Sequence, residues 1–305
     1  PELRKRGYPD SISIGTLAGA GTLGLLIPPS ITMIVYGVMA NVSIAKLFIA
    51  GILPGVVLAG LFMGYTMLWA LFNPDKVPAP DQTMGFRQKL AASRHLLPAV
   101  SLILAVLGSI YTGIATATEA AALGVVGSLA VAAVQGDLSW KTFIESLLSG
   151  TRLYCMIAMI LFGAAFLTLS MGYIGLPRHV AEWIVSLNLS PFALILALTV
   201  FFILLGCFLD GISMVVLTMG VLLPTIEAMQ IDLVWFGIFV VLIVEMAQIT
   251  PPVGFNLFVL QGMTRKDIAF IARHTFPMFM LMVVAVLLIY FVPDIVGWLP
   301  QHMDG

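Results

Sequence analysis

Charged residues are scarce in this sequence. Only 10% of its 305 residues are Asp, Glu, Lys or Arg, whereas 60% are apolar and the mean hydropathy is +1.08. A soluble domain carries about 25% charged residues. Because so few charges cannot cover a soluble globule of this length, we predict a protein embedded in a lipid bilayer through several spans.

Basic clusters, cysteine pairs and enzyme signatures are also missing. The formal net charge is −1, and no basic face of the kind that binds nucleic acid is visible. Cys155 and Cys207 lie inside apolar runs, where packing is a better interpretation than a disulfide. The sequence has no Walker A loop and no nucleophile elbow, and its four histidines form no metal-ligand pattern. We expect neither an enzyme nor a cofactor.

Several apolar runs are long enough to cross a membrane, which takes about 20 residues. They include residues 44–72, 96–114 and 192–223. No alternation typical of a β-barrel occurs, so the predicted fold is all-α and polytopic. The longest polar stretch, residues 73–95, carries several basic residues and is predicted to be a cytoplasmic loop.

Helix breakers interrupt some of these runs. Broken backbone inside hydrocarbon is tolerated only where protein or a water-filled cavity surrounds it. The predicted breaks, which indicate a buried polar site, lie at residues 19–30, near 172–177, at 210–211 and at 247–254.

The prolines indicate an internal repeat. Placing Pro28 on Pro251, an offset of 223 residues, also pairs Pro1 with Pro224 and Pro54 with Pro277. Basic residues precede the first double proline and follow the second, which is the pattern of an inverted-topology repeat. Accidental loop charge remains the alternative. Residues 1–72 would form the later part of the first repeat and residues 96–300 the second.

Freed carbonyl groups at such breaks suit Na⁺, and half-helix N-termini suit an anionic substrate. Asp210 is the sharpest candidate, since intramembrane ionisable residues are usually functional, although it could simply cap a half-helix. A tight crossing of small residues is the alternative for the first break. The predicted Na⁺ ligands are Gly21, Thr22, Gly24, Pro28, Ser30, Asp210, Gly211, Ser213, Met214, Ala247 and Thr250. The predicted substrate contacts are Ser30, Thr116, Thr118, Gly254 and Asn256, and the structural breaks are Pro29, Pro251 and Pro252.

Two acids allow more than one interpretation. Glu119 is either a functional residue or a first-turn acid of a helix over residues 120–134. Glu245 lies one turn before the break of the second copy and could be a ligand, the partner of a Lys or Arg, or a proton site.

Several ordered motifs resemble the large membrane subunit of tripartite ATP-independent periplasmic (TRAP) transporters. They are Gly7-Tyr8, residues 21–30 (GTLGLLIPPS), 34–37 (IVYG), 47–55 (LFIAGILPG), 113–121 (GIATATEAA), 208–210 (FLD) and 250–254 (TPPVG). Ala117 departs from the proline that is usual in that family.

The resemblance implies Na⁺-driven import of a small organic anion, such as a C4-dicarboxylate or a sialic acid, by an elevator mechanism in the bacterial inner membrane. It implies two partners, a small four-helix membrane subunit and a periplasmic substrate-binding protein. It also implies further chain before Pro1, so that this fragment lacks the early helices of the first repeat and one ion site is incomplete. The first alternative is a stand-alone Na⁺/dicarboxylate symporter of related fold. An ion channel is a weaker alternative.

Overall fold

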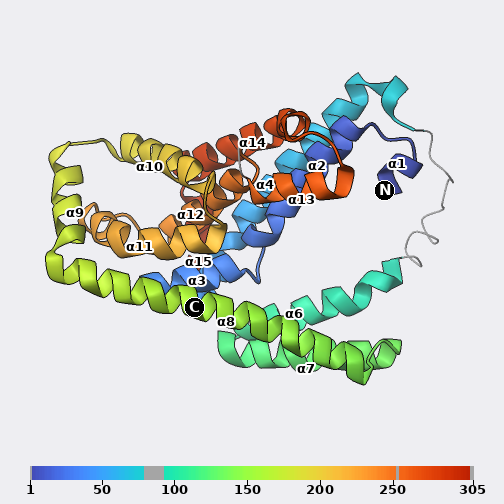
Figure 1. Cartoon of the computed structure of the whole chain (residues 1–305), viewed down its shortest axis with the longest axis horizontal. Coiled ribbons are helices and arrows are strands. Elements are labelled where there is room, and N and C mark those ends of the chain that lie inside the picture. The colour runs from blue at the N-terminus through green and yellow to red at the C-terminus, as the bar shows by residue number, and fades with distance from the viewer. Residues whose placement is uncertain (1, 79–92, 252–253, 303–305) are drawn as a thin grey trace. The chain divides into compact units, whose positions relative to one another are not determined.

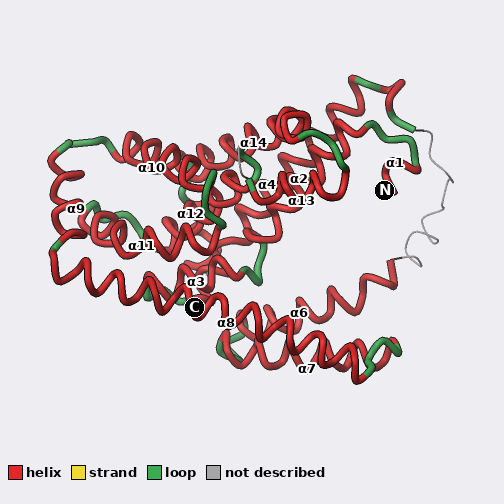
Figure 2. Tube along the Cα trace, viewed as in Figure 1, coloured by secondary structure: helices red, strands yellow, loops and turns green. Residues whose placement is uncertain are grey.

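The computed structural model describes residues 2–78, 93–251 and 254–302. Within these ranges every regular element is a helix (Figures 1 and 2). The α-helices are α1 (Glu2–Lys5), α2 (Asp10–Leu26), α3 (Ile31–Ala40), α4 (Ile44–Phe72), α6 (Leu97–Tyr111), α7 (Ala117–Gln135), α8 (Trp140–Ile174), α9 (Leu176–Ser186), α10 (Pro191–Gly206), α11 (Gly211–Ala228), α12 (Leu233–Gln248), α13 (Phe255–Thr264), α14 (Ile268–Phe291) and α15 (Asp294–Gln301). Two 3₁₀ turns, η1 (Pro74–Lys76) and η2 (Ser93–Leu96), flank part of the predicted loop, whose residues 79–92 lie outside the described ranges.

The prediction of an all-α polytopic membrane protein is confirmed. Among the described residues, five helices are long and apolar enough to cross a bilayer, namely α4, α7, α8, α11 and α14. The pair α2 and α3, bent by 40° at the break between them, would make a sixth span.

The chain divides into two compact units. One contains residues 1–78 and 160–305, and the other contains residues 79–159. In the second unit α6 packs along α7, where Gly124 leaves room for Val106; a methyl group on Gly124 would lie 3.2 Å from the Val106 Cγ2. Thr116 begins α7 with a capping box, in which its backbone N–H donates to the Glu119 carboxylate at 2.8 Å. The first-turn interpretation of Glu119 therefore accounts for its position.

Helix α12 forms the centre of the first unit. Its residues 236–247 are all buried, and it contacts α2, α3, α4, α10, α11 and α14. A helix that is apolar on all sides is stable only when other elements surround it. Tyr36 of α3 fixes the start of α12 by donating its hydroxyl to the Leu233 carbonyl at 2.7 Å.

Three helices recur at the offset that the prolines indicate. Helices α12, α13 and α14 begin 223, 224 and 224 residues after α2, α3 and α4. Pro54 lies inside α4 and Pro277 inside α14, while α3 and α13 both end at a left-handed residue, Asn41 (φ 53°) and Arg265 (φ 55°). The matching order shows two similar three-helix segments; their opposite orientation across the bilayer stays a prediction.

The first break is shorter than the sequence indicated. Helix α2 continues through all three glycines to Leu26, and only residues 27–30 are non-helical. Gly19 is needed for packing, because a methyl group there would lie 3.1 Å from the Met278 Sδ and 3.2 Å from the Phe62 ring. At this position the crossing of small residues is the correct interpretation.

Candidate functional site

The first break joins α2 to α3 through residues 27–30. Ser30 is buried and caps α3, with its hydroxyl oxygen accepting from the Met33 N–H at 3.4 Å. Thr22 is also buried, and its hydroxyl donates to the Gly19 carbonyl at 2.8 Å. Pro28 is buried and Pro29 exposed. The hydroxyl groups of Thr22 and Ser30 thus each have a backbone partner on their own helix.

The predicted break near residues 172–177 lies at Gly175, between α8 and α9. Asp210 caps the start of α11 at the break predicted at residues 210–211, which we call the second break. Its carboxylate accepts from the N–H groups of Ile212 at 3.1 Å and Ser213 at 3.4 Å, and from the Ser213 hydroxyl. The capping interpretation therefore holds in this conformation. The Asp210 residue is exposed within this chain, so the capping role leaves the carboxylate open to a further ligand.

The third break follows α12. The Thr250 hydroxyl donates to the Met246 carbonyl at 2.7 Å, and the Gly254 N–H donates to the Thr250 carbonyl at 3.0 Å. Gly254 has no room for a side chain, because a methyl group would lie 2.5 Å from the Gln248 carbonyl oxygen. This close approach of the backbone requires glycine at position 254. Pro252, a predicted structural break, lies outside the described residues.

The structure brings the second and third breaks together. A methyl group on Gly211 would lie 2.6 Å from Val244 Cγ1 and 3.0 Å from Gln248 Nε2, on the last turns of α12. The Cys207 thiol donates to the Pro251 carbonyl at 3.4 Å. Of the predicted ligands, Met214 and Ala247 are buried there and pack around Gly206.

Helix α2, which precedes the first break, lies against α13, which follows the third break. A methyl group on Gly21 would lie 3.8 Å from Asn256 Nδ2, the amide of the first turn of α13. By contrast, a methyl group on Gly24 would have no other atom within 4 Å. We call the cluster formed by residues 207–214, 247–251, 254–256 and Gly21 the break cluster. It contains most of the predicted ligands and lies wholly within the first unit.

Thr116 and Thr118 belong to the second unit, and their predicted role in substrate binding stays a prediction. Among the described residues, no three His, Cys, Asp or Glu side chains are grouped as metal ligands. Both cysteines are free, with Cys155 exposed and Cys207 buried.

A pocket of about 430 Å³ adjoins the third break and was not predicted from the sequence. Residues Ile249, Thr250 and Pro251 form one wall, and α14 contributes Arg273 together with two phenylalanines. An arginine beside a helix break has the chemistry to hold a carboxylate. Arg273 is one of the basic residues that follow the second double proline, a pattern that predicts membrane orientation and does not by itself predict a binding pocket.

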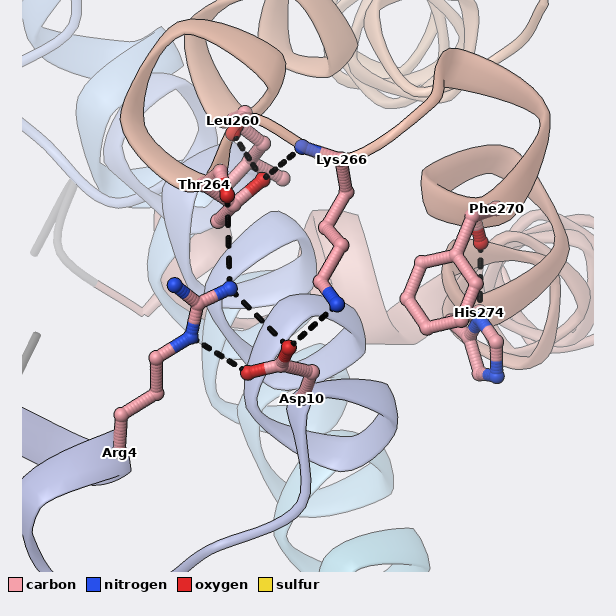
Figure 3. A network of polar contacts seen from close by, with 7 residues as sticks. All are labelled: Arg4, Asp10, Leu260, Thr264, Lys266, Phe270 and His274. Carbon is pink, nitrogen blue, oxygen red and sulfur yellow. Dashed lines mark hydrogen bonds and ion pairs between the residues drawn. The ribbon is translucent and has the colours of Figure 1, made fainter.

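A second unpredicted feature is an ionic network that ties α1 and α2 to the turn after α13 (Figure 3). Asp10 accepts from Arg4 Nε at 2.6 Å and lies 3.1 Å from Lys266 Nζ, while Arg4 Nη2 donates to the Thr264 carbonyl at 3.4 Å. The hydrogen bond to Asp10 raises the pKa of the Arg4 guanidinium. The network therefore links the two similar segments at one end.

Comparison with known proteins identifies the family of the chain. The family model described as the tripartite ATP-independent periplasmic transporter, DctM component, matches residues 1–295. The chain belongs to this DctM family. It is 32% identical to the C4-dicarboxylate TRAP transporter large permease protein DctM of Pseudomonas aeruginosa over 300 residues, which covers 98% of this chain and 70% of that protein.

Other relatives in this DctM family carry different substrate names. The sialic acid TRAP transporter permease protein SiaT of Haemophilus influenzae is 30% identical over 98% of this chain and 48% of its own length. The isethionate TRAP transporter permease protein DctMQ of Oleidesulfovibrio alaskensis is 31% identical over 97% of this chain and 46% of its own length. These relatives are named as transporter permeases, and the chain is a multi-pass membrane protein of that kind.

Proposed function

We propose that the chain is part of the large permease of a Na⁺-coupled importer of small organic anions in the bacterial inner membrane. Its partners would be a small membrane subunit and a periplasmic substrate-binding protein. The observation that carries the proposal is the break cluster, in which three interrupted helices meet inside one unit. Freed backbone carbonyls and hydroxyls are the hard oxygen ligands that a small cation prefers.

The substrate would bind beside the third break. The pocket next to Thr250 is mostly apolar and carries Arg273 in its wall, which suits an organic acid with one carboxylate and an apolar or hydroxylated body. Na⁺ and substrate would then share the backbone of residues 249–251, at the end of α12. An ion that holds those carbonyl groups also fixes the N–H groups of the following half-helix, which gives a physical route for coupling. Elevator movement of this unit is part of the same proposal.

The test is uptake by the complete permease in proteoliposomes, with candidate substrate-binding proteins added one at a time. We expect uptake to need an inward Na⁺ gradient and a binding protein, and to need no ATP. Uptake that is equal with and without the Na⁺ gradient would contradict Na⁺ coupling. Uptake without any binding protein would favour a stand-alone symporter instead.

Arg273→Gln tests the substrate site within the same assay. We expect it to raise the substrate concentration for half-maximal uptake by at least tenfold while leaving the Na⁺ dependence nearly unchanged. Arg178→Gln is the matched control, because Arg178 pairs with Glu182 at 2.8 Å on α9. An Arg273 variant that transports like the control would exclude this pocket as the substrate site.

A further inference from the structure

A second pocket, of about 540 Å³, lies at the start of α12, whereas the break cluster lies at the end of that helix. Its walls come from α4, α10, α12, α14 and α15 and from the residues that lead into them. All of these helices belong to the first unit. None of the residues that line the pocket has a part in the proposed function, so the pocket is a separate candidate site.

The pocket lies where two of the candidate spans end. Helix α4 begins at Ile44 and α14 ends at Phe291, and Lys46 and Tyr290 line the pocket from those two ends. Trp298 on the following helix, α15, is 49% exposed. Tryptophan and tyrosine are typical of the level at which the hydrocarbon meets the lipid headgroups. We therefore expect the pocket to face the headgroup layer of one leaflet.

Trp235 forms a fixed apolar wall of the pocket. Its indole N–H donates to the Ile289 carbonyl at 3.0 Å, and its ring stacks on Phe239 with 5.6 Å between the ring centroids. Tyr290 packs against Phe192, with the ring centroids 5.2 Å apart. Because these rings are already packed, they can receive apolar ligand surface with little further loss of side-chain entropy. This wall suits the glycerol region and the first methylene groups of a lipid.

The charged groups of the pocket are unequal in number. Of the residues that line it, Lys46 is basic, whereas Asp232 and Asp294 are acidic. Whatever Lys46 pairs with, the carboxylates outnumber it, so the pocket favours a ligand that brings a cationic group. Asp232 Oδ1 accepts the Trp235 N–H at 2.7 Å, and a carboxylate can accept several hydrogen bonds at once. Asp294, in the first turn of α15, is exposed. A lysine and two carboxylates around one cavity match a ligand with both a phosphate and an ammonium group.

We propose that this pocket binds the headgroup of phosphatidylethanolamine. The lipid phosphate would lie beside Lys46, and the primary ammonium group would donate hydrogen bonds to Asp294 and Asp232. Phosphatidylcholine has no N–H group to donate, and phosphatidylglycerol would bring a negative charge without a cation to balance it. A lipid bound in this way would stabilise the folded first unit where α4, α12 and α15 meet. The proposal holds whether or not Na⁺ drives transport.

Native mass spectrometry of the delipidated complete permease tests the proposal, because it gives a binding constant for each added lipid. We expect phosphatidylethanolamine to bind about tenfold more tightly than phosphatidylcholine, because phosphatidylcholine cannot make the charge-assisted hydrogen bonds to the carboxylates. Phosphatidylglycerol should also bind more weakly than phosphatidylethanolamine. Equal binding of the three lipids by the wild type would overturn the proposal without any variant.

Two variants separate the two charged groups of the lipid. Lys46→Gln should weaken phosphatidylethanolamine and phosphatidylcholine alike, since both carry the phosphate. Asp294→Asn should weaken phosphatidylethanolamine alone, so that most of its preference over phosphatidylcholine is lost. Lys141→Gln and Asp137→Asn, at exposed positions of the second unit, are the matched controls and should bind lipid as the wild type does. A preference that persists unchanged in both pocket variants would place the lipid site elsewhere on the permease and contradict the proposal.

The alternative occupant of the pocket is a protein partner. Capture of a purified substrate-binding protein by the permease, measured on the same variants, separates the two. We expect Asp294→Asn to lose lipid preference and to keep capture. If this variant instead loses capture while its lipid binding is unchanged, the pocket is a protein contact and the lipid proposal is wrong.

Discussion

A methyl group on Gly211 probes the contact between the Asp210 break and the end of α12. Gly211 is the first helical residue after the Asp210 cap, and its Cα faces the buried side chain of Val244. An added Cβ would lie 2.6 Å from Val244 Cγ1, about 1 Å inside ordinary van der Waals contact. Val244 is β-branched and stiff, so the clash cannot be relieved by a simple rotamer change.

The expected cost of Gly211→Ala is that of an overpacked core, about 1–3 kcal/mol. The gain in helix propensity on replacing glycine by alanine, about 0.5–1 kcal/mol, offsets only part of it. Gly64→Ala in α4 is the matched control, since no atom lies within 4 Å of a methyl group there. We expect this control to be neutral or slightly stabilising in thermal unfolding of the purified permease.

A double-mutant cycle makes the test specific. Val244→Ala alone should destabilise by leaving a cavity. The double variant Gly211→Ala/Val244→Ala should lose less stability than the sum of the two single losses, by about 0.5–3 kcal/mol, because the new methyl group occupies the space that Val244 vacates. Strict additivity, or a Gly211→Ala variant as stable as the control, would refute the contact between the two breaks.

Four further predictions concern the same unit. Thr250→Val removes the hydroxyl that bonds the Met246 carbonyl, and should raise the Na⁺ concentration for half-maximal uptake; an unchanged Na⁺ titration would remove Thr250 from the site. Asp210→Ser keeps the cap and should unfold near the wild-type temperature, yet lose Na⁺ affinity, whereas Asp210→Ala should also lose about 0.5–2 kcal/mol of stability. Asp10→Asn weakens the ionic network with Arg4 and Lys266, which lies near the surface, and should lower the melting temperature slightly. This difference from the wild type should vanish at high salt. Lys266 lies in a basic loop beside a span, which predicts the cytoplasmic side, so Lys266→Cys should be labelled from that side only; labelling from outside would contradict this orientation.

The positions of the breaks were predictable because glycine, proline and aspartate have direct effects on the backbone. Proline removes a donor, and aspartate accepts the free N–H groups of a helix start, so the interruptions before Ser30, at Asp210 and at Thr250 were visible from local residue types. The extent of the first break was not predictable, because Gly19 fits a helix once Met278 and Phe62 pack against it. Helix propensity is a weak local effect that tertiary packing overrides.

Contacts between distant parts of the chain could not be predicted in the same way. Arg4 and Asp10 are near neighbours in sequence, but their third member, Lys266, comes from the other similar segment. The pocket beside Thr250 likewise needs α14 to lie against the break, which no local pattern specifies. Glu245 is buried, and neither of its carboxyl oxygens has a hydrogen-bond partner among the described residues. This is harder still to predict from the sequence, because it depends on every helix around the side chain.

The central position of α12 explains how one movement could affect every part of the break cluster. The last turns of α12 carry Val244 and Gln248, which lie against Gly211 at the start of α11, and α13, the next helix, carries Asn256 beside Gly21. A change in the backbone at Thr250 would therefore shift the Asp210 cap and the α2 contact together. Coupling between two ligands needs only that each favours the same arrangement, and it typically amounts to about 1–3 kcal/mol. A rigid buried helix that ends in a break can transmit a difference of that size because its interior cannot deform gradually.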